Sequence, residues 1–289
     1  MSQTKDVFQL IRQKSSELSQ AQLKVARFLE THQDTAPFLT VAQLAGQAGV
    51  GEATVVRFAH CLGFSGYSEL QQSLQTQIRK RLTTVERLNL AEDRYPHKQR
   101  LAIGVLAEDM NNIEQTMQNL DLRAFDAAVN RIHRAKSVTV VAMRSSYALG
   151  HFLTFYLQLL LKNCRLLSDS DTMFEKLATL DHDDLVIGIS FSRYTARTVQ
   201  AMKFLRERGV RTIAITDTHS SPLSSVSDLT LTASSSIPSF LDSFVAPLSL
   251  INALLTAVAQ HNKKEISQHL HEMEKLWEAE GVYYHPFPK

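Results

Sequence analysis

The spacing of apolar side chains changes character about 120 residues along the chain. Up to residue 76, apolar positions recur at the three- and four-residue spacing of amphipathic helices, which predicts an all-helical segment. From about residue 121, short apolar runs alternate with helical stretches, which is typical of a parallel sheet with crossover helices. The expected strands are Val138–Ala142, Cys164–Leu167, Leu185–Ser190, Thr212–Thr216 and Leu229–Thr232. The pattern predicts a multidomain chain: an all-α bundle followed by an α/β open parallel sheet.

The segment between these two patterns is polar and compatible with helix. It is interrupted at Arg94-Tyr95-Pro96-His97, where proline disfavours a continuous helix. We therefore expect three parts: a helical domain over residues 1–80, a linker and joining helix over 81–120, and an α/β domain over 121–289. The α/β domain is expected to end with C-terminal helices: a long apolar helix covers 241–260, and a charged segment then runs to Lys289.

Composition and charge refine this division without changing it. The 289 residues are 44% hydrophobic and 21% charged, the balance of a globular protein. Residues 1–82 contain nine Lys and Arg against six Asp and Glu, a net charge of +3, while the whole chain carries only +2. The positive charge therefore gathers on the helical domain, which favours that domain as the part that faces a nucleic acid.

The sequence also indicates a cytoplasmic protein. Met1–Leu10 is polar and mixed, unlike a signal peptide, and the longest apolar stretch, Ala148–Leu161, is too short and too polar to span a bilayer. Cys61 and Cys164 each lie among apolar residues, so we expect two free thiols in a reducing compartment and no membrane association.

A helix-turn-helix is predicted between residues 39 and 62. Thr40 and Gln43 have the spacing of a capping box, which marks the start of the first helix. Gly49-Val50-Gly51 then forms a tight turn, since glycine accepts the positive φ that such a turn requires. Two short apolar stripes flank this turn: Val41, Leu44, Ala45 and Ala48, and then Val55, Phe58, Ala59 and Leu62. This arrangement is the helix-turn-helix of DNA-binding proteins.

The second of these helices has a polar face that suits the DNA major groove. Arg57 is expected to read a guanine or to bind a phosphate, and Thr54 to contact a thymine methyl group or a phosphate. The candidate DNA-binding residues are Thr40, Glu52, Thr54, Arg57 and His60. The alternative is a helical hairpin with an ordinary solvated face. An earlier helix, capped by Ser19, supplies the third helix of a DNA-binding bundle and favours DNA.

Hydroxyl side chains follow two of the expected strands. Ser145 and Ser146 come after Val138–Ala142, and Ser190-Phe191-Ser192-Arg193-Tyr194-Thr195 comes at the end of the third strand. In an open parallel sheet, ligands bind beyond the carboxyl ends of the strands, where hydroxyls and helix N-termini attract anions. The alternative is that these hydroxyls only cap helices. Two such loops at one edge favour a site for a phosphate.

Both halves of the chain resemble one known family. Leu39–Ala45, Ala53–Phe58 and Leu62–Tyr67 look like the helix-turn-helix of the RpiR family of bacterial regulators, over roughly residues 4–80. Residues 121–262 resemble the sugar isomerase domain of phosphosugar isomerases and of these regulators. Ile189–Thr195 is similar to that domain's Ser-x-Ser-Gly-x-Thr phosphate loop. The resemblance implies a sugar isomerase fold with flavodoxin-like layering.

The resemblance also implies roles for individual residues. Ser190, Ser192 and Thr195 correspond to phosphate ligands, and Ser146, with Ser145 beside it, to the serine after the first strand.

The sequence departs from the family at three positions. Gly51 replaces a usual serine cap, Ala142 replaces a frequent glycine, which is expected to narrow the space near the ligand, and Arg193 replaces the glycine of the phosphate loop. We interpret Arg193 as a sixth ligand residue that clamps the anion, the alternative being a surface position.

The function that this resemblance implies is ligand-gated DNA binding. We expect a homodimer or homotetramer on a palindromic double-stranded operator, controlled by a sugar-phosphate effector, with no catalytic residue, cofactor or metal. One alternative is a phosphosugar isomerase with a DNA-binding appendage, although no Glu or His can be assigned as its base. The other is a C-terminal domain that only dimerises.

Overall fold

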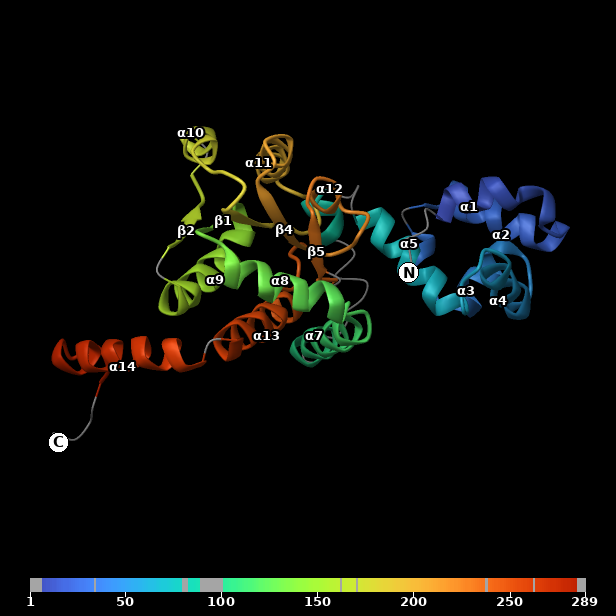
Figure 1. Ribbon diagram of the computed structural model, residues 1–289. Coiled ribbons are helices and arrows are strands. Elements are labelled where there is room, and N and C mark those ends of the chain that lie inside the picture. The colour runs from blue at the N-terminus through green and yellow to red at the C-terminus, as the bar shows by residue number, and fades with distance from the viewer. Residues whose placement is uncertain are drawn as a thin grey trace. The chain divides into compact units, whose positions relative to one another are not determined.

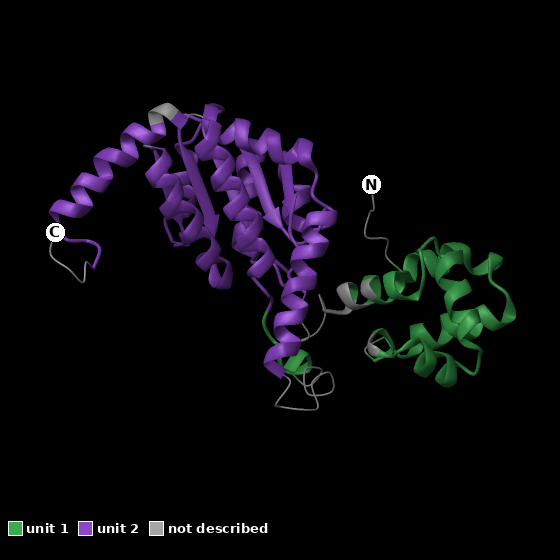
Figure 2. Ribbon diagram, turned by 90° about the horizontal axis from the view of Figure 1, so that it is seen from below, with its two compact units in different colours: residues 1–96, 238–241 green, residues 97–237, 242–289 purple. Residues whose placement is uncertain are grey.

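The protein divides into two compact units in the computed structural model. They comprise residues 1–96 with 238–241, and residues 97–237 with 242–289 (Figures 1 and 2). The structure describes residues 7–33, 35–79, 83–88, 101–161, 163–169, 171–236, 239–261 and 263–284. The interruption expected at 94–97 lies outside the described residues.

The first unit is a helical bundle, as predicted for residues 1–76. Its helices are α1 (Val7–Lys14), α2 (Gln20–Thr31), α3 (Val41–Ala48), α4 (Glu52–Cys61) and α5 (Tyr67–Arg79), with short 3₁₀ turns at Ser15–Glu17 and Ala36–Phe38. Their apolar stripes meet in one core, in which Leu29, Leu44 and Phe58 are completely or almost completely buried. Each such side chain contributes about 1.5–3 kcal/mol to folding, which is more than helix propensity alone supplies.

Local capping fixes where these helices begin. The Ser19 hydroxyl accepts from the Gln22 N–H while the Gln22 amide oxygen accepts from the Ser19 N–H, and Thr40 and Gln43 repeat the arrangement at α3. The sequence predicted the capping box of α3 and a helix capped by Ser19. The two boxes satisfy backbone donors that the first turn of a helix leaves without partners.

The second unit contains a five-stranded sheet in which every strand is parallel. The strands are β1 (Val138–Ala142), β2 (Cys164–Leu167), β3 (Leu185–Ile189), β4 (Arg211–Thr216) and β5 (Leu229–Thr232), in the order β2-β1-β3-β4-β5. All five agree with the prediction to within one residue. The order is that of flavodoxin-like folds and places a topological switch point between β1 and β3.

Helices cover both faces of this sheet (Figure 1). They are α7 (Leu101–Gln118), α8 (Leu122–Arg134), α9 (Tyr147–Leu160), α10 (Met173–Ala178), α11 (Ala196–Glu207), α12 (Pro222–Ser225), α13 (Val245–His261) and α14 (Lys263–Ala279). Val140 and Ile187 pack with α8, α9 and α13, whereas the neighbouring Val141 and Val186 pack with α10, α11 and α12. The two-residue alternation of the strands thus builds a core on each face.

The C-terminal region differs from the expectation in two respects. The apolar helix α13 begins at Val245 rather than 241, where the Ser243 hydroxyl accepts from the Val245 N–H. The charged segment that follows forms the helix α14, in which Ile266 is buried. Seven charged side chains among its 17 residues obscured the helical spacing of its apolar residues. Within the described parts of the chain, no helix is both long enough and apolar enough to cross a membrane.

Candidate functional site

The turn between α3 and α4 depends on two glycines with different roles. Gly49 ends α3 in the left-handed conformation, with φ 65° and ψ 42°, which glycine adopts without strain. Gly51 is the N-cap of α4 with φ −80° and ψ 152°, an ordinary conformation for a capping residue. It supplies no capping side chain, and the Thr54 N–H donates instead to the Gly51 carbonyl oxygen at 2.9 Å. The N-terminal end of a helix attracts anions, including DNA phosphates.

The candidate DNA-binding residues lie on two helices of this motif. Glu52, Arg57 and His60 are exposed on α4, Thr54 is half-buried there, and Thr40 is exposed at the start of α3. The Arg57 Nε donates to the Ala53 carbonyl oxygen at 3.2 Å, which holds the guanidinium along α4. Its terminal nitrogens make no hydrogen bond to the described residues and remain able to donate.

His60 occupies a different place from the other α4 candidates. Its Nδ1 lies 3.1 Å from the carbonyl oxygen of Phe64, in the last turn of the helix. The structure therefore places Glu52 and Thr54 in the N-terminal half of α4. Arg57 lies just past the middle, with its side chain bonded back to Ala53, and His60 is tied to the turn that follows. Recognition by residues in the N-terminal half is the usual docking mode of this motif.

Three long-range hydrogen bonds hold α3 and α4 in place, and sequence reasoning missed all of them. The Tyr67 hydroxyl and the Gln71 amide each donate to the Leu39 carbonyl oxygen at 2.7 Å, which ties α5 to the start of α3. The Lys14 ammonium donates to the Cys61 carbonyl oxygen at 2.6 Å, at the C-terminal end of α4. Burial raises the pKa of Tyr67 to about 12, so its phenol remains a donor at neutral pH. The partners are backbone carbonyls, which leave no sequence signal.

In the second unit, the two hydroxyl loops lie next to each other. Ala142 at the end of β1 pairs with Ile189 at the end of β3, so the loops that follow begin side by side at the switch point. The first loop leads into α9 and the second into α11. Both helices direct their positive N-terminal ends toward this edge of the sheet.

The hydroxyls of these loops are not used as helix caps. Ser146 and Thr195 occupy the N-cap positions of α9 and α11, yet neither side chain makes a capping hydrogen bond. Ser145 is exposed, Ser192 and Thr195 are half-buried, and Ser146 is buried. These four hydroxyls make no hydrogen bond to other described residues. The arrangement favours ligand binding over the capping alternative.

Ser190 differs from the other loop serines because it shapes the loop itself. It is 2% exposed, and its hydroxyl oxygen accepts from the Thr195 N–H at 3.1 Å. Its hydroxyl hydrogen remains available to an anion. A change at Ser190 would therefore disturb both the loop and any ligand in it.

Each loop contains one arginine in the left-handed backbone region. Arg144 has φ 55° and Arg193 has φ 60°, and no other described non-glycine residue has a positive φ. The conformation costs a side-chain-bearing residue about 1–2 kcal/mol. Arg193 thus keeps the backbone that the family's glycine adopts without strain, and adds a positive charge to the loop. Strain of this kind concentrates at functional sites.

Tyr194 anchors the second loop to the neighbouring strand, a role that sequence reasoning did not assign. Its hydroxyl donates to the Asp217 carboxylate at 2.7 Å, and the Thr216 hydroxyl donates to the same oxygen at 3.2 Å. Burial, and secondarily the charge of Asp217, raise the pKa of Tyr194 far above its usual value. The phenol therefore stays neutral and serves as a fixed donor.

The expectation that Ala142 narrows the ligand space is wrong. Ala142 is fully buried, and a Cβ built at Gly150 of α9 would overlap the Cβ of Ala142. The alanine methyl group therefore points into the interface between β1 and α9, away from the loops. The methyl group of Ala142 takes up space between β1 and α9. Gly150 provides that space because it has no side chain.

Comparison with known proteins places both halves of the chain in one family. Residues 5–81 match the helix-turn-helix domain of the rpiR family, and residues 131–257 match the SIS domain. The sugar isomerase domain of an RpiR transcription factor from Sphaerobacter thermophilus is 33% identical, with a TM-score of 0.59, and the match covers 61% of this chain and 99% of that one. The chain belongs to the RpiR family of transcriptional regulators. It is therefore a DNA-binding regulator.

Other proteins match this chain along nearly its whole length. An HTH-type regulator of Caldanaerobacter subterraneus subsp. tengcongensis is 24% identical over 271 residues, 92% of this chain and 94% of that protein. HexR of Pseudomonas aeruginosa is 25% identical over 277 residues, 92% and 93% of the two chains. Vibrio vulnificus NanR, solved with ManNAc-6P, shares the fold with a TM-score of 0.58 and 20% identity, covering 94% of this chain and 98% of that one.

Proposed function

We propose that this RpiR-family regulator binds a sugar phosphate between the loops after β1 and β3, and that the ligand controls operator binding. One observation carries the proposal: the hydroxyls of Ser146, Ser192 and Thr195 lie at two adjacent helix N-termini and do not cap those helices. Hydrogen bonds from hydroxyls and backbone N–H groups suit the oxygens of a phosphate, and the helix dipoles favour its charge. The ManNAc-6P bound to NanR supports the same class of effector.

The loops divide the work of holding this ligand. In the proposal, Ser145, Ser146, Ser192 and Thr195 donate to the phosphate, while Ser190 fixes the second loop and adds a fifth donor. Arg193 supplies the positive charge. Tyr194 keeps this loop at a fixed distance from β4 through Asp217. Because these contacts exist before the ligand arrives, little binding energy is lost in ordering the site.

DNA binding is assigned to the first unit. Thr40, Glu52, Thr54, Arg57 and His60 are its proposed contacts, with residues 1–80 as the DNA-binding domain, 81–120 as the connection and 121–289 as the sensor. A palindromic operator requires two recognition helices about one DNA turn apart, and therefore at least a homodimer. Such a protein acts where the chromosome lies, in the cytoplasm.

Helix α7 supports self-association because its exposed face is apolar and its covered face has a buried polar residue. Ile103, Leu106, Met110 and Met117 are each more than 60% exposed and fall on one stripe of the helix. On the covered side, the buried Asn112 donates to the Ser236 carbonyl oxygen at 2.8 Å. An apolar stripe of this length on a helix with a polar inner face fits a second copy of the chain.

Light scattering after size-exclusion chromatography tests the oligomer. Leu106→Glu with Met110→Glu should yield monomers, whereas Asn111→Glu with Gln118→Glu, exposed on the same helix outside the stripe, should keep the parent mass. Equal masses for both pairs would place the interface elsewhere.

A thermal-shift screen of phosphosugars tests the ligand, with NMR of the same mixtures to detect any new sugar. A ligand at a hundred times its dissociation constant stabilises the protein by about 2.7 kcal/mol. A shift without product supports the sensor. Formation of a product supports the alternative, an isomerase with a DNA-binding appendage. The absence of both a thermal shift and a product supports a domain that only dimerises. Asp217, the carboxylate bonded to Tyr194, already accepts two hydrogen bonds, which disfavours it as an isomerase base.

A further inference from the structure

A cavity lies at the opposite end of the sheet from the hydroxyl loops. It has a volume of about 520 Å³ and opens at the amino ends of β4 and β5. Arginines dominate its lining: Arg131 and Arg134 from α8, Arg206 from α11 and Arg211 from the first position of β4, with Asp228 as the acidic member. A volume in this range is typical of small-molecule sites.

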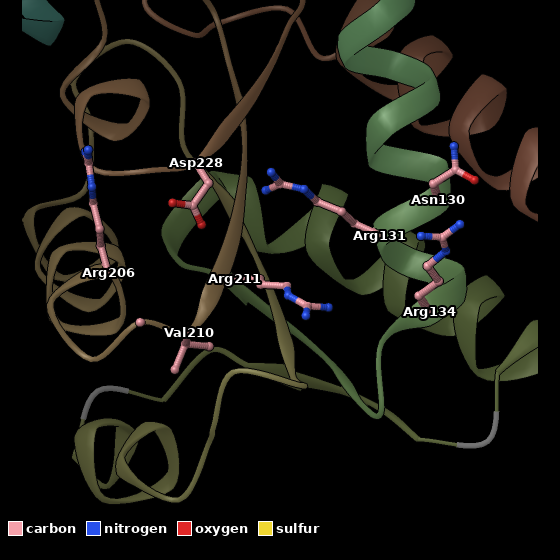
Figure 3. A pocket seen from close by; sticks show the side chains of 8 residues that line it. Asn130, Arg131, Arg134, Arg206, Val210, Arg211 and Asp228 are labelled. Carbon is pink, nitrogen blue, oxygen red and sulfur yellow. The ribbon is translucent and has the colours of Figure 1, made fainter.

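Three of these arginines converge on one part of the cavity. Figure 3 shows Arg131 and Arg134 on α8 and the Arg211 side chain extending toward them, while Arg206 lies on the far side of β4. Arg131 is partly held by a hydrogen bond from its Nη1 to the Thr212 carbonyl oxygen at 3.4 Å. Each guanidinium has five N–H donors, so most of those in the cavity remain open.

The positive charge of this cavity is not balanced by the described residues. Four arginines line the cavity against one carboxylate, that of Asp228, one oxygen of which also accepts from the N–H and the hydroxyl of Thr212 at 2.8 and 2.9 Å. Arg134 and Arg211 make no hydrogen bond or ion pair to any described residue. Like charges brought together repel, and a bound anion removes that cost.

From this geometry we propose a second ligand site, which takes a small polyanion with two phosphate-like groups. The guanidinium fork matches phosphate oxygens in pairs, and Arg134 with Arg211 provides two such forks on different elements. The cavity is concave and of metabolite size, whereas a DNA backbone lies across a surface. The site is separate from the loops after β1 and β3, so it stands or falls independently of the sugar-phosphate proposal.

Calorimetric titration of the full chain with inorganic pyrophosphate tests this site. Arg134→Gln with Arg211→Gln should weaken binding at least tenfold. The matched control is Arg123→Gln with Lys176→Gln, which removes the same charge from exposed positions on α8 and α10 and should bind as the parent does. The double variant Ser146→Ala with Ser192→Ala should also keep the pyrophosphate affinity of the parent, because those residues follow the carboxyl ends of the strands, at the opposite end of the sheet.

Several outcomes would overturn the proposal. An equal loss of pyrophosphate affinity in the two charge-neutralised double variants would mean that the positive charge of the protein attracts anions in general. Loss only in the serine pair would place pyrophosphate at the hydroxyl loops. If Arg134→Gln with Arg211→Gln weakens binding to random-sequence DNA but not to pyrophosphate, the arginines contact nucleic acid instead. Thermal unfolding without ligand keeps the test interpretable, because removing unopposed exposed charges should not lower the melting temperature.

Discussion

Arg193 has a strained backbone conformation and a positively charged side chain, and a glycine in its place would remove both. Its backbone lies in the left-handed region with φ 60°, which costs a side-chain-bearing residue about 1–2 kcal/mol. Arg193→Gly should therefore raise the free energy of unfolding by roughly 1 kcal/mol, less the entropy that glycine adds to the unfolded chain. The same change should weaken phosphosugar binding, because it removes the positive charge.

Arg193→Lys is the matched control for this prediction. It keeps the charge and the strained backbone but removes the planar fork, so stability should stay at the parent level while ligand affinity falls. Urea unfolding and calorimetric titration measure the two quantities. Parent-like affinity in both variants would place Arg193 outside the ligand site.

Arg57 is the residue at which DNA recognition is most directly tested. It is exposed on α4, and its Nε is held by the Ala53 carbonyl oxygen. Arg57→Ala should weaken binding to an operator selected from random DNA by roughly 1–3 kcal/mol. Arg27→Ala, which removes an exposed arginine from α2, should bind as the parent does. Fluorescence anisotropy measures both, and equal affinities would exclude Arg57 from recognition.

Cys164 provides a prediction about pH. Burial raises the pKa of its thiol to about 12, so only about one molecule in ten thousand carries the thiolate at pH 8. Alkylation of Cys164 in the folded protein should therefore be very slow at pH 8 and accelerate steeply toward pH 11, whereas the urea-unfolded chain reacts readily. Mass spectrometry of the Cys164 peptide follows the reaction, and fast labelling of the folded protein at pH 8 would contradict the raised pKa of this thiol.

At the scale of elements, β1 and α9 approach each other closely at Gly150, near the ligand loops. A Cβ at Gly150 would overlap the Cβ of Ala142 and lie 3.1 Å from the Leu166 Cδ1. Gly150→Ala should destabilise the protein by roughly 1–3 kcal/mol through overpacking. Adding Ala142→Gly should recover part of the loss, because it removes the opposing methyl group. Additive effects in a double-mutant cycle would show that the two residues do not touch.

The same elements show what the sequence could and could not predict. The capping boxes and the five strands were found because their signals are local: a hydroxyl three residues before an amide, or a short apolar run. The bond from Tyr194 to Asp217 and the contact of Ala142 with Gly150 were not, since they depend on which elements become neighbours. The bounds of helix α14 were not predicted, because its charged side chains hide the spacing of its apolar ones.

For the whole molecule, regulation requires that the ligand bind two arrangements of the protein unequally. A ligand with equal affinity for both shifts nothing, and coupling energies of roughly 1–3 kcal/mol, or about 5–150-fold in affinity, are typical. The loops that hold the proposed ligand open directly into α9 and α11. We propose that movement of these helices carries the effect of the ligand to a dimer interface and thereby changes the spacing of two recognition helices.

The most direct test is the affinity of the full chain for its selected operator, with and without the phosphosugar found by thermal shift. We predict a change of at least fivefold in the parent at saturating ligand. Ser192→Ala should need at least tenfold more ligand for the same change, whereas Ser267→Ala, at an exposed serine of α14, should respond as the parent does. If the ligand binds by calorimetry but leaves the operator affinity of the parent unchanged, ligand control of DNA binding is wrong.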